Sequence, residues 1–257
     1  MFKRVLVFAY GVGSYAVFFA TFLYALCFVG NFIVPVTIDG PPRTDFGTAL
    51  LTNLGLLGAF ALQHSLMARP FFKRWLTRFI PDAAERSTYV LVSSIALIAL
   101  FAFWQPLGGE IWNVTSPLGQ AVLYGAFFTG WMLVLVSTFL INHFDLFGLR
   151  QVWLQLLGKP YTQLKFGTPL FYRYVRHPLY VGWFFAFWAT PTMTVTHLVF
   201  AIATTAYILI AIQLEERDLI DAHPEYENYR RSVPMLIPFT KRRPQASQRI
   251  ASAVQPR

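Results

Sequence analysis

The chain carries little charge for its length. Of its 257 residues, 13% are charged and 56% are hydrophobic, whereas a soluble domain has about 25% charged residues. This composition excludes an ordinary soluble globular protein and predicts an integral membrane protein. The net charge of +9 would suit nucleic acid in a soluble protein. In an apolar chain, basic residues instead set topology and contact anionic headgroups, so we expect membrane lipid and no nucleic acid as a partner.

Cysteine and histidine are scarce as well. Cys27 is the one cysteine, which excludes an intrachain disulfide and a metal site made of cysteines. None of the five histidines has the His-x-x-x-His or Glu-x-x-His spacing of helical metal sites, so we predict no metal. The sequence also lacks a glycine-rich nucleotide loop after a strand and the nucleophile elbow of serine hydrolases.

Long apolar runs are abundant. Four of them, at 5–34, 46–67, 87–105 and 118–142, have about the 20 residues that a membrane helix needs. A fifth region, 179–214, is interrupted at Thr190-Pro191-Thr192, where proline favours a turn between a short and a long helix. We therefore predict an all-α polytopic transmembrane bundle of five to six helices. Six are favoured, with a C-terminal hairpin and a cytoplasmic helical cap.

Basic residues alternate between loops. They cluster before the first run, between the second and third, after the fourth, and near the end of the chain, while the other loops hold few. The positive-inside rule then places both termini in the cytoplasm. The segment 147–157 has the pattern of an interfacial amphipathic helix, and 215–229 that of a polar extension of the last helix.

Polar side chains gather where the runs end. Each group alone is explained by helix capping or by side chains reaching the headgroups. Together they lie at the same, cytoplasmic ends of their helices, so they predict a polar cavity walled by an apolar bundle. The groups are Gln63-His64-Ser65, Asn142-His143-Phe144-Asp145, Arg176-His177 and Glu215-Glu216.

The C-terminal third resembles the isoprenylcysteine carboxyl methyltransferase superfamily of membrane proteins. The resemblance lies in an ordered set of motifs, and Ser232 departs from the basic residue often found before Val-Pro. The upstream segments 63–70 and 142–151 are similar to its bacterial branch related to NnrU and nurim, which implies a location in the bacterial inner membrane. The C-terminal motifs are Arg176-His177-Pro178-Leu179-Tyr180-Val181-Gly182, Glu215-Glu216, Tyr226-Glu227-Asn228-Tyr229 and Val233-Pro234-Met235-Leu236-Ile237-Pro238.

The resemblance implies S-adenosyl-L-methionine as cofactor, bound without a Rossmann fold. It implies one membrane methyltransferase domain over residues 1–243, with N-terminal helices in 1–142, a cofactor-binding region in 143–243 and a polar tail in 244–257. The residues that it carries over to cofactor binding are Arg176, His177, Tyr180, Gly182, Glu215, Glu216, Tyr226, Tyr229 and Pro234.

Within this branch the implied reaction is methylation of a small hydrophobic thiol, methanethiol, to dimethyl sulfide. The thiol must become a thiolate to attack well. We expect His143 or Asp145 to act as base or to orient it, with His64 as a second candidate and Arg150 beside them. Gln63, Ser65, Asn142 and Gln151 are expected to line the substrate pocket.

Three other interpretations remain open. One is a methyltransferase for a carboxylate or another lipophilic acceptor, such as a prenylated cysteine. Another is a non-catalytic membrane protein or small transporter of the NnrU or nurim type. The most remote is a haem protein that uses His64, His143, His177 or His197 as axial ligands. No obligatory protein partner is evident.

Overall fold

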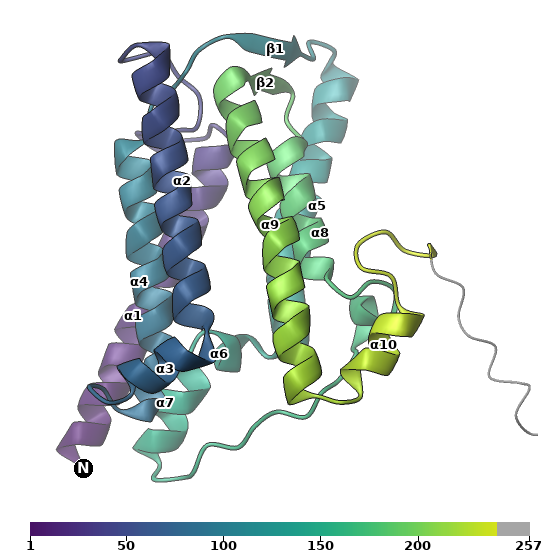
Figure 1. The fold of residues 1–257 in the computed structure, drawn as a ribbon. Coiled ribbons are helices and arrows are strands. Elements are labelled where there is room, and N and C mark those ends of the chain that lie inside the picture. The colour runs from purple at the N-terminus through teal and green to yellow at the C-terminus, as the bar shows by residue number, and fades with distance from the viewer. Residues whose placement is uncertain (241–257) are drawn as a thin grey trace, which may run out of the picture.

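Five long apolar helices make up the bundle. The computed structural model describes residues 1–240, so the predicted tail at 244–257 lies outside the described residues. Each long helix has the length and composition needed to cross a membrane, and they run side by side in Figure 1. They are α1 (Phe2–Val29), α2 (Phe46–Ala68), α4 (Asp82–Phe103), α5 (Pro117–Ile141) and α9 (Val195–Ala222).

Side-chain caps begin three of these helices. Asp45 accepts a hydrogen bond from the Thr48 amide at the start of α2, and Ser116 does the same for α5, where Pro117 follows. Thr194 caps α9. Such caps satisfy amides that have no partner within the helix, so they fix the point at which each helix begins.

The sixth apolar element, α8 (Pro178–Trp188), is short. Its 11 residues reach about 16 Å at 1.5 Å per residue, which is half of a membrane. It packs along α5, where Gly130 and Gly182 face each other. A Cβ built on Gly182 would lie 2.7 Å from the Gly130 carbonyl oxygen. The predicted hairpin of a short and a long helix, broken at Thr190-Pro191-Thr192, is confirmed.

A small sheet, which the sequence analysis did not predict, closes the far end. Strand β1 (Glu110–Asn113) pairs antiparallel with β2 (Thr192–Thr194), with a bulge between Glu110 and Trp112. The pairing joins the loop before α5 to the turn between α8 and α9, at the top of Figure 1.

Five short elements lie at the opposite end, together with the N-terminus (Figure 1): α3 (Pro70–Leu76), α6 (His143–Leu146), α7 (Leu149–Leu156), the 3₁₀ helix η1 (Leu170–Arg173) and α10 (Tyr226–Ser232). The predicted amphipathic helix is present as α7, and Gly11 of α1 packs against its Val152. The predicted continuation of the last helix to Tyr229 is wrong. The helix α9 ends before His223, which is extended because Pro224 follows it.

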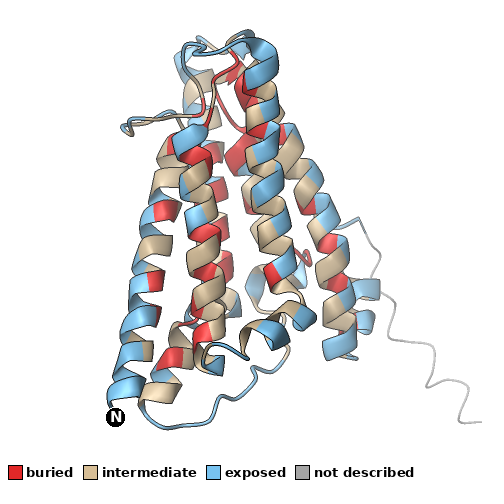
Figure 2. Ribbon diagram, turned by 60° about the vertical axis from the view of Figure 1, so that its left-hand side comes forward, coloured by how far each residue is buried: buried red, intermediate tan, exposed pale blue. Residues whose placement is uncertain are grey.

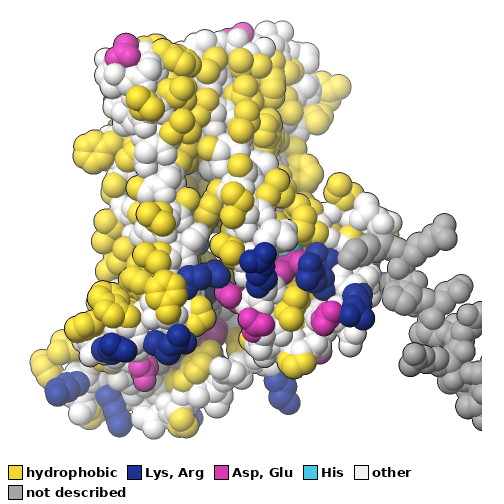
Figure 3. Space-filling model, in the orientation of Figure 1, with side chains coloured by type: hydrophobic (Ala, Val, Ile, Leu, Met, Phe, Trp, Pro, Cys, Tyr) yellow, Lys and Arg dark blue, Asp and Glu magenta, His cyan; other side chains and the backbone are white. Residues whose placement is uncertain are grey.

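Burial follows the expectation for a membrane bundle. Buried residues lie on the inner faces of the helices, and exposed ones lie mainly on the outside (Figure 2). Large apolar side chains cover the outside of the long helices, and Lys and Arg side chains gather at the end that carries α3 and α10 (Figure 3). The core is aromatic and lies toward the end with the sheet. It includes Phe28, Phe101, Trp104, Phe127, Trp131, Phe187 and Phe200.

Candidate functional site

A cavity of about 1180 Å³ lies inside the bundle. Ligand pockets typically measure about 300–1,000 Å³, so this one can hold a large cofactor beside a small second molecule. All five long helices and α8 contribute to its wall, and residues 164–173 and α10 close its polar end.

The two halves of the cavity differ in chemistry. The half toward the sheet is apolar and aromatic, and it includes Phe22, Phe101, Trp131, Trp183, Phe187 and Phe200. The half toward α10 carries charges and hydroxyls, and it includes Arg69, Arg86, Lys165, Arg173, Arg176, His177, Tyr180, Glu215, Asp218, Tyr226 and Tyr229. One space therefore joins a charged chamber to an apolar one.

Glu216 organises the charged end from behind the cavity wall. Its side chain is 4% exposed, and one carboxylate oxygen accepts from Arg176 Nε at 2.6 Å and contacts His177 Nε2 at 3.0 Å. Tyr226 also donates to that oxygen, and Arg230 pairs with the other one at 3.1 Å. Four side chains from two segments thus converge on one carboxylate. A charge this buried is stable only with such partners.

Arg176 and His177 are also joined to the C-terminal segment through the backbone. Their amides donate to the carbonyl oxygens of Pro234 and Met235 at 2.9 and 3.2 Å. Arg176 also donates through its guanidinium to the carbonyl oxygen of Val233. These bonds hold the cap, which we define as residues 226–238, over the end of the cavity.

Glu215 has a different environment from its neighbour. It lines the cavity, accepts one hydrogen bond from Tyr180 at 2.8 Å, and keeps 45% of its side chain exposed. Successive helix residues point about 100° apart, so one carboxylate faces the cavity and the next faces the cap.

An aromatic cluster borders the charged end. The Phe166 ring lies 5.8 and 5.6 Å from the rings of Tyr226 and Tyr229, which are themselves 5.5 Å apart. Burial raises the pKa of both tyrosines above the ordinary value, so their hydroxyls stay neutral. The cluster presents flat, uncharged surfaces to the cavity beside the Glu215 carboxylate.

His143 lies at the wall of the cavity with both ring nitrogens engaged. Nε2 is 2.8 Å from the Tyr15 hydroxyl, and Nδ1 is 2.8 Å from the Thr138 hydroxyl. The Phe139 ring stacks on the imidazole at 4.2 Å. Burial lowers the pKa of His143, which favours the neutral ring.

His64 lies across the cavity in a second polar network. Its ring contacts the Tyr89 hydroxyl at 2.8 Å and the Ser93 hydroxyl at 3.2 Å. Gln63 donates to the same Ser93 and does not line the cavity, whereas Ser65 lines it and contacts Tyr207 of α9 at 3.1 Å.

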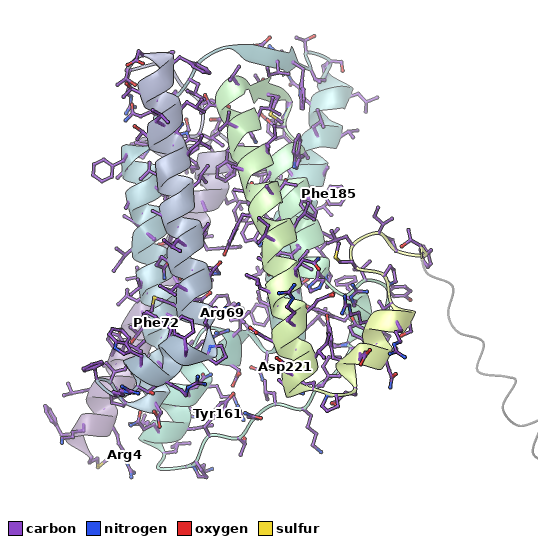
Figure 4. The ribbon with its side chains drawn as sticks, in the orientation of Figure 1. Arg4, Arg69, Phe72, Tyr161, Phe185 and Asp221 are labelled. Carbon is purple, nitrogen blue, oxygen red and sulfur yellow. The ribbon has the colours of Figure 1, made fainter. Side chains whose placement is uncertain are left out.

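Asp145 and Arg150 pair with each other below the cavity instead of lining it. Their contact is 2.8 Å, and Tyr161 donates to the second Asp145 oxygen. Arg150 also donates to two oxygens of Thr162, the backbone carbonyl oxygen and the side-chain hydroxyl oxygen. The pair therefore ties the segment that carries Phe166 to the ends of α6 and α7, near the labelled Tyr161 in Figure 4.

The other predicted site residues have local roles. Asn142 caps α6 by accepting from the Asp145 amide, and Gln151 donates to the Asp145 carbonyl oxygen. Gly182 faces α5 and not the cavity. Arg69, one of the basic residues counted for topology, pairs with Asp218 of α9 at 3.0 Å, between α2 and α9 in Figure 4.

Several wall residues were not predicted as site residues. They are Phe166, Tyr172, Tyr89 and Arg86, to which Tyr15 and Thr138 are added as partners of His143. Arg86 could have been noticed as a charge close to an apolar run. Tyr15 and Thr138 lie within apolar runs and carry no signal of their own. Within residues 1–240, no group of three or more His, Cys, Asp or Glu residues is arranged to hold a metal ion.

The chain is similar to curated proteins over most of its length. It is 60% identical to the methanethiol S-methyltransferase of Crocosphaera subtropica over 238 residues, which cover 92% of this chain and 93% of that protein. It is 53% identical to the methanethiol S-methyltransferase of Mycobacterium tuberculosis over 93% of this chain and 99% of that protein. Nurim of Xenopus laevis is 30% identical over 72% of this chain and 68% of its own length.

No family model and no solved structure matches the chain. The similarity to these two methyltransferases nevertheless covers more than nine-tenths of the chain. The chain belongs to the methanethiol S-methyltransferase family of integral membrane proteins, to which nurim is more distantly related.

Proposed function

We propose that the protein transfers a methyl group from S-adenosylmethionine to methanethiol and releases dimethyl sulfide. Its family makes it a membrane methyltransferase, so a methyl donor and an acceptor must both be accommodated. The observation that carries the proposal is the single cavity with a charged, aromatic end and an apolar end. A polar cofactor suits the first end, and a small apolar thiol suits the second.

The residues at the charged end fit S-adenosylmethionine by their chemistry. The half-exposed carboxylate of Glu215 can accept from ribose hydroxyls or from the amino group. The rings of Phe166, Tyr226 and Tyr229 offer faces for the adenine and for the sulfonium. Arg173 and Lys165 also line this end and can pair with the cofactor's carboxylate.

Arg176, His177 and Glu216 would act mainly by holding the cap in place, because their polar atoms are largely engaged with one another and with the cap backbone. When bound, S-adenosylmethionine supplies a methyl group on a positively charged sulfur, which a thiolate can displace in line. The protein's part is then to align the acceptor and to remove its proton.

The residues of the cavity wall suit the two tasks of aligning the acceptor and removing its proton. The aromatic rings of Trp131, Trp183 and Phe187 leave an apolar space that excludes water. Arg86, which is held by the Leu146 carbonyl oxygen, adds positive charge that favours a thiolate. His143 on the same wall is the base that we propose. The charged end would face the cytoplasm, because Lys and Arg gather there (Figure 3). The membrane would be the bacterial inner membrane.

Binding measurements on the detergent-solubilised protein separate this function from the alternatives. We expect calorimetry to detect S-adenosylmethionine, and Glu215→Gln to weaken its binding about tenfold through one lost charged hydrogen bond. Product assays should then show turnover with methanethiol and none with a prenylated cysteine. Turnover with the prenylated acceptor alone would favour the lipophilic alternative. No cofactor binding would favour a non-catalytic nurim-like protein.

A further inference from the structure

The hydrogen-bond partners of His143 determine where its proton lies. The Thr138 hydroxyl is 2.6 Å from the Leu135 carbonyl oxygen, which can only accept. A hydroxyl has one hydrogen, and Thr138 donates it to the Leu135 carbonyl oxygen. The Thr138 oxygen must therefore accept a hydrogen bond from His143 Nδ1. A neutral imidazole has one N–H group. Nε2 is therefore the acceptor, and the Tyr15 hydroxyl donates to it.

We propose that Tyr15 and Thr138 are positioning residues that hold His143 as its Nδ1–H tautomer, so that Nε2 is the nitrogen that takes the proton of the acceptor thiol. This inference rests on the proposed thiol methylation. The two residues come from α1 and α5, so the long helices themselves set the state of a ring in the short helix α6.

The proton step balances with these groups. The thiol displaces the Tyr15 hydroxyl from the one lone pair of Nε2, the S–H bond breaks, its electron pair stays on sulfur, and the proton goes to Nε2. The Tyr15 hydroxyl then returns as an acceptor from Nε2–H, while Nδ1–H stays on Thr138. After the thiolate has taken the methyl group, the imidazolium releases the proton to solvent. Tyr15 and Thr138 thus have a hydrogen bond to the ring in both of its charge states.

Other charges near α6 are engaged elsewhere. Asp145 of the same helix pairs with Arg150 of α7 at 2.8 Å. Arg86 of α4 donates to the Leu146 carbonyl oxygen at 2.8 Å. On α1 the titratable group that meets the ring is Tyr15 itself, and α5 meets it with Thr138 and the stacked Phe139.

Both positioning residues should shift the titration of His143 to lower pH. Tyr15 donates to the neutral ring and accepts from the imidazolium, and the bond to the charged ring is the stronger one, so Tyr15→Phe should lower the pKa of His143. Thr138 accepts from Nδ1–H and stabilises the imidazolium more than the neutral ring, so Thr138→Val should lower it as well. We expect about 0.5–1 pH unit in each case. Thr138→Ser keeps the hydroxyl and is the matched control, expected to leave the titration unchanged.

NMR of the detergent-solubilised full chain without cofactor measures this directly. The chain has five histidines, so histidine-labelled protein gives few signals, and His143→Gln assigns the one of interest. Tyr15→Phe keeps the ring that meets His143 edge-on at 5.7 Å, which preserves packing. The pH dependence of kcat/KM for dimethyl sulfide formation has an acid limb, whose apparent pKa should change in each variant by as much as the pKa of His143 measured by NMR.

Nitrogen NMR signals that place the proton of neutral His143 on Nε2, or an unchanged pKa in both variants, would overturn the assignment of the tautomer. Lowered pKa values without a matching change in the acid limb would overturn the link between His143 and the thiol's proton. If dimethyl sulfide never forms although the NMR shifts are as expected, the proposed function itself has failed, and the role in thiol deprotonation fails with it.

Discussion

Replacement of Glu216 should separate the cap from the bundle. The carboxylate is 4% exposed on its side chain and holds Arg176, whose guanidinium is also buried. Glu216→Gln keeps the shape of the side chain but removes the charge that balances this arginine. Removing one partner of a buried ion pair costs about 3–5 kcal/mol. The contact with Arg230, which is 46% exposed on its side chain, adds less than about 1 kcal/mol.

A loss of about 3 kcal/mol corresponds to a factor of about 100 in the equilibrium between the docked and the released cap. Hydrogen exchange measures that equilibrium. The amides of Arg176 and His177 bond to the carbonyl oxygens of Pro234 and Met235, so they report docking without any ligand. Their exchange should become roughly 100 times faster in Glu216→Gln.

The neighbouring carboxylate supplies a matched control. Glu215→Gln makes the same chemical change one residue away, where the side chain is half-exposed and accepts from Tyr180. It should leave exchange at Arg176 and His177 unchanged while it weakens cofactor binding. Unchanged exchange in Glu216→Gln, or equal effects of the two substitutions, would refute the reasoning.

Three further substitutions test the packing and the charges. Gly182→Ala should lower stability by about 1–3 kcal/mol, because the new Cβ would meet the Gly130 carbonyl oxygen. Gly125→Ala is the control, since open space surrounds that position, and it should not lower stability. Equal melting temperatures of the two variants in detergent would contradict this. Burial raises the pKa of Asp39, but contacts with His197 and Thr194 outweigh it, and the pKa stays below the ordinary value. This stabilisation is present above the unfolded pKa of about 4 and is lost as pH falls through the folded pKa. Asp39→Asn should therefore flatten the acid side of the plot of melting temperature against pH. Parallel plots for the wild type and the variant would argue against it. Asp145→Asn weakens the contacts to Arg150 and Tyr161 and should make the segment 157–169 more sensitive to limited proteolysis; an unchanged cleavage pattern would count against that role.

The bundle and the position of its polar end could be predicted from the sequence. Apolar runs of membrane length and the proline at Pro191 have direct physical consequences, and helix ends on one side of a bundle must lie near one another. The small sheet could not be predicted, because β1 and β2 are four and three residues long and pair across the far end of the bundle.

The division of roles within the site was beyond the sequence. Glu215 and Glu216 are adjacent and chemically identical, and only the rotation of α9 shows which one faces the cavity. Tyr15 lies 128 residues from His143 in an apolar run, so nothing local marks it as a partner. Phe166 lies in a segment without helix or strand, whose path depends on contacts such as Arg150 with Thr162.

The most direct test of the proposed function follows the methyl group. Purified protein in detergent would receive S-adenosylmethionine with a trideuterated methyl group together with unlabelled methanethiol, and the headspace would be analysed by mass spectrometry. The account predicts dimethyl sulfide that carries one trideuterated methyl group, formed by the wild type and strongly reduced in Glu215→Gln. Unlabelled dimethyl sulfide, or none from a protein that binds the cofactor, would contradict it.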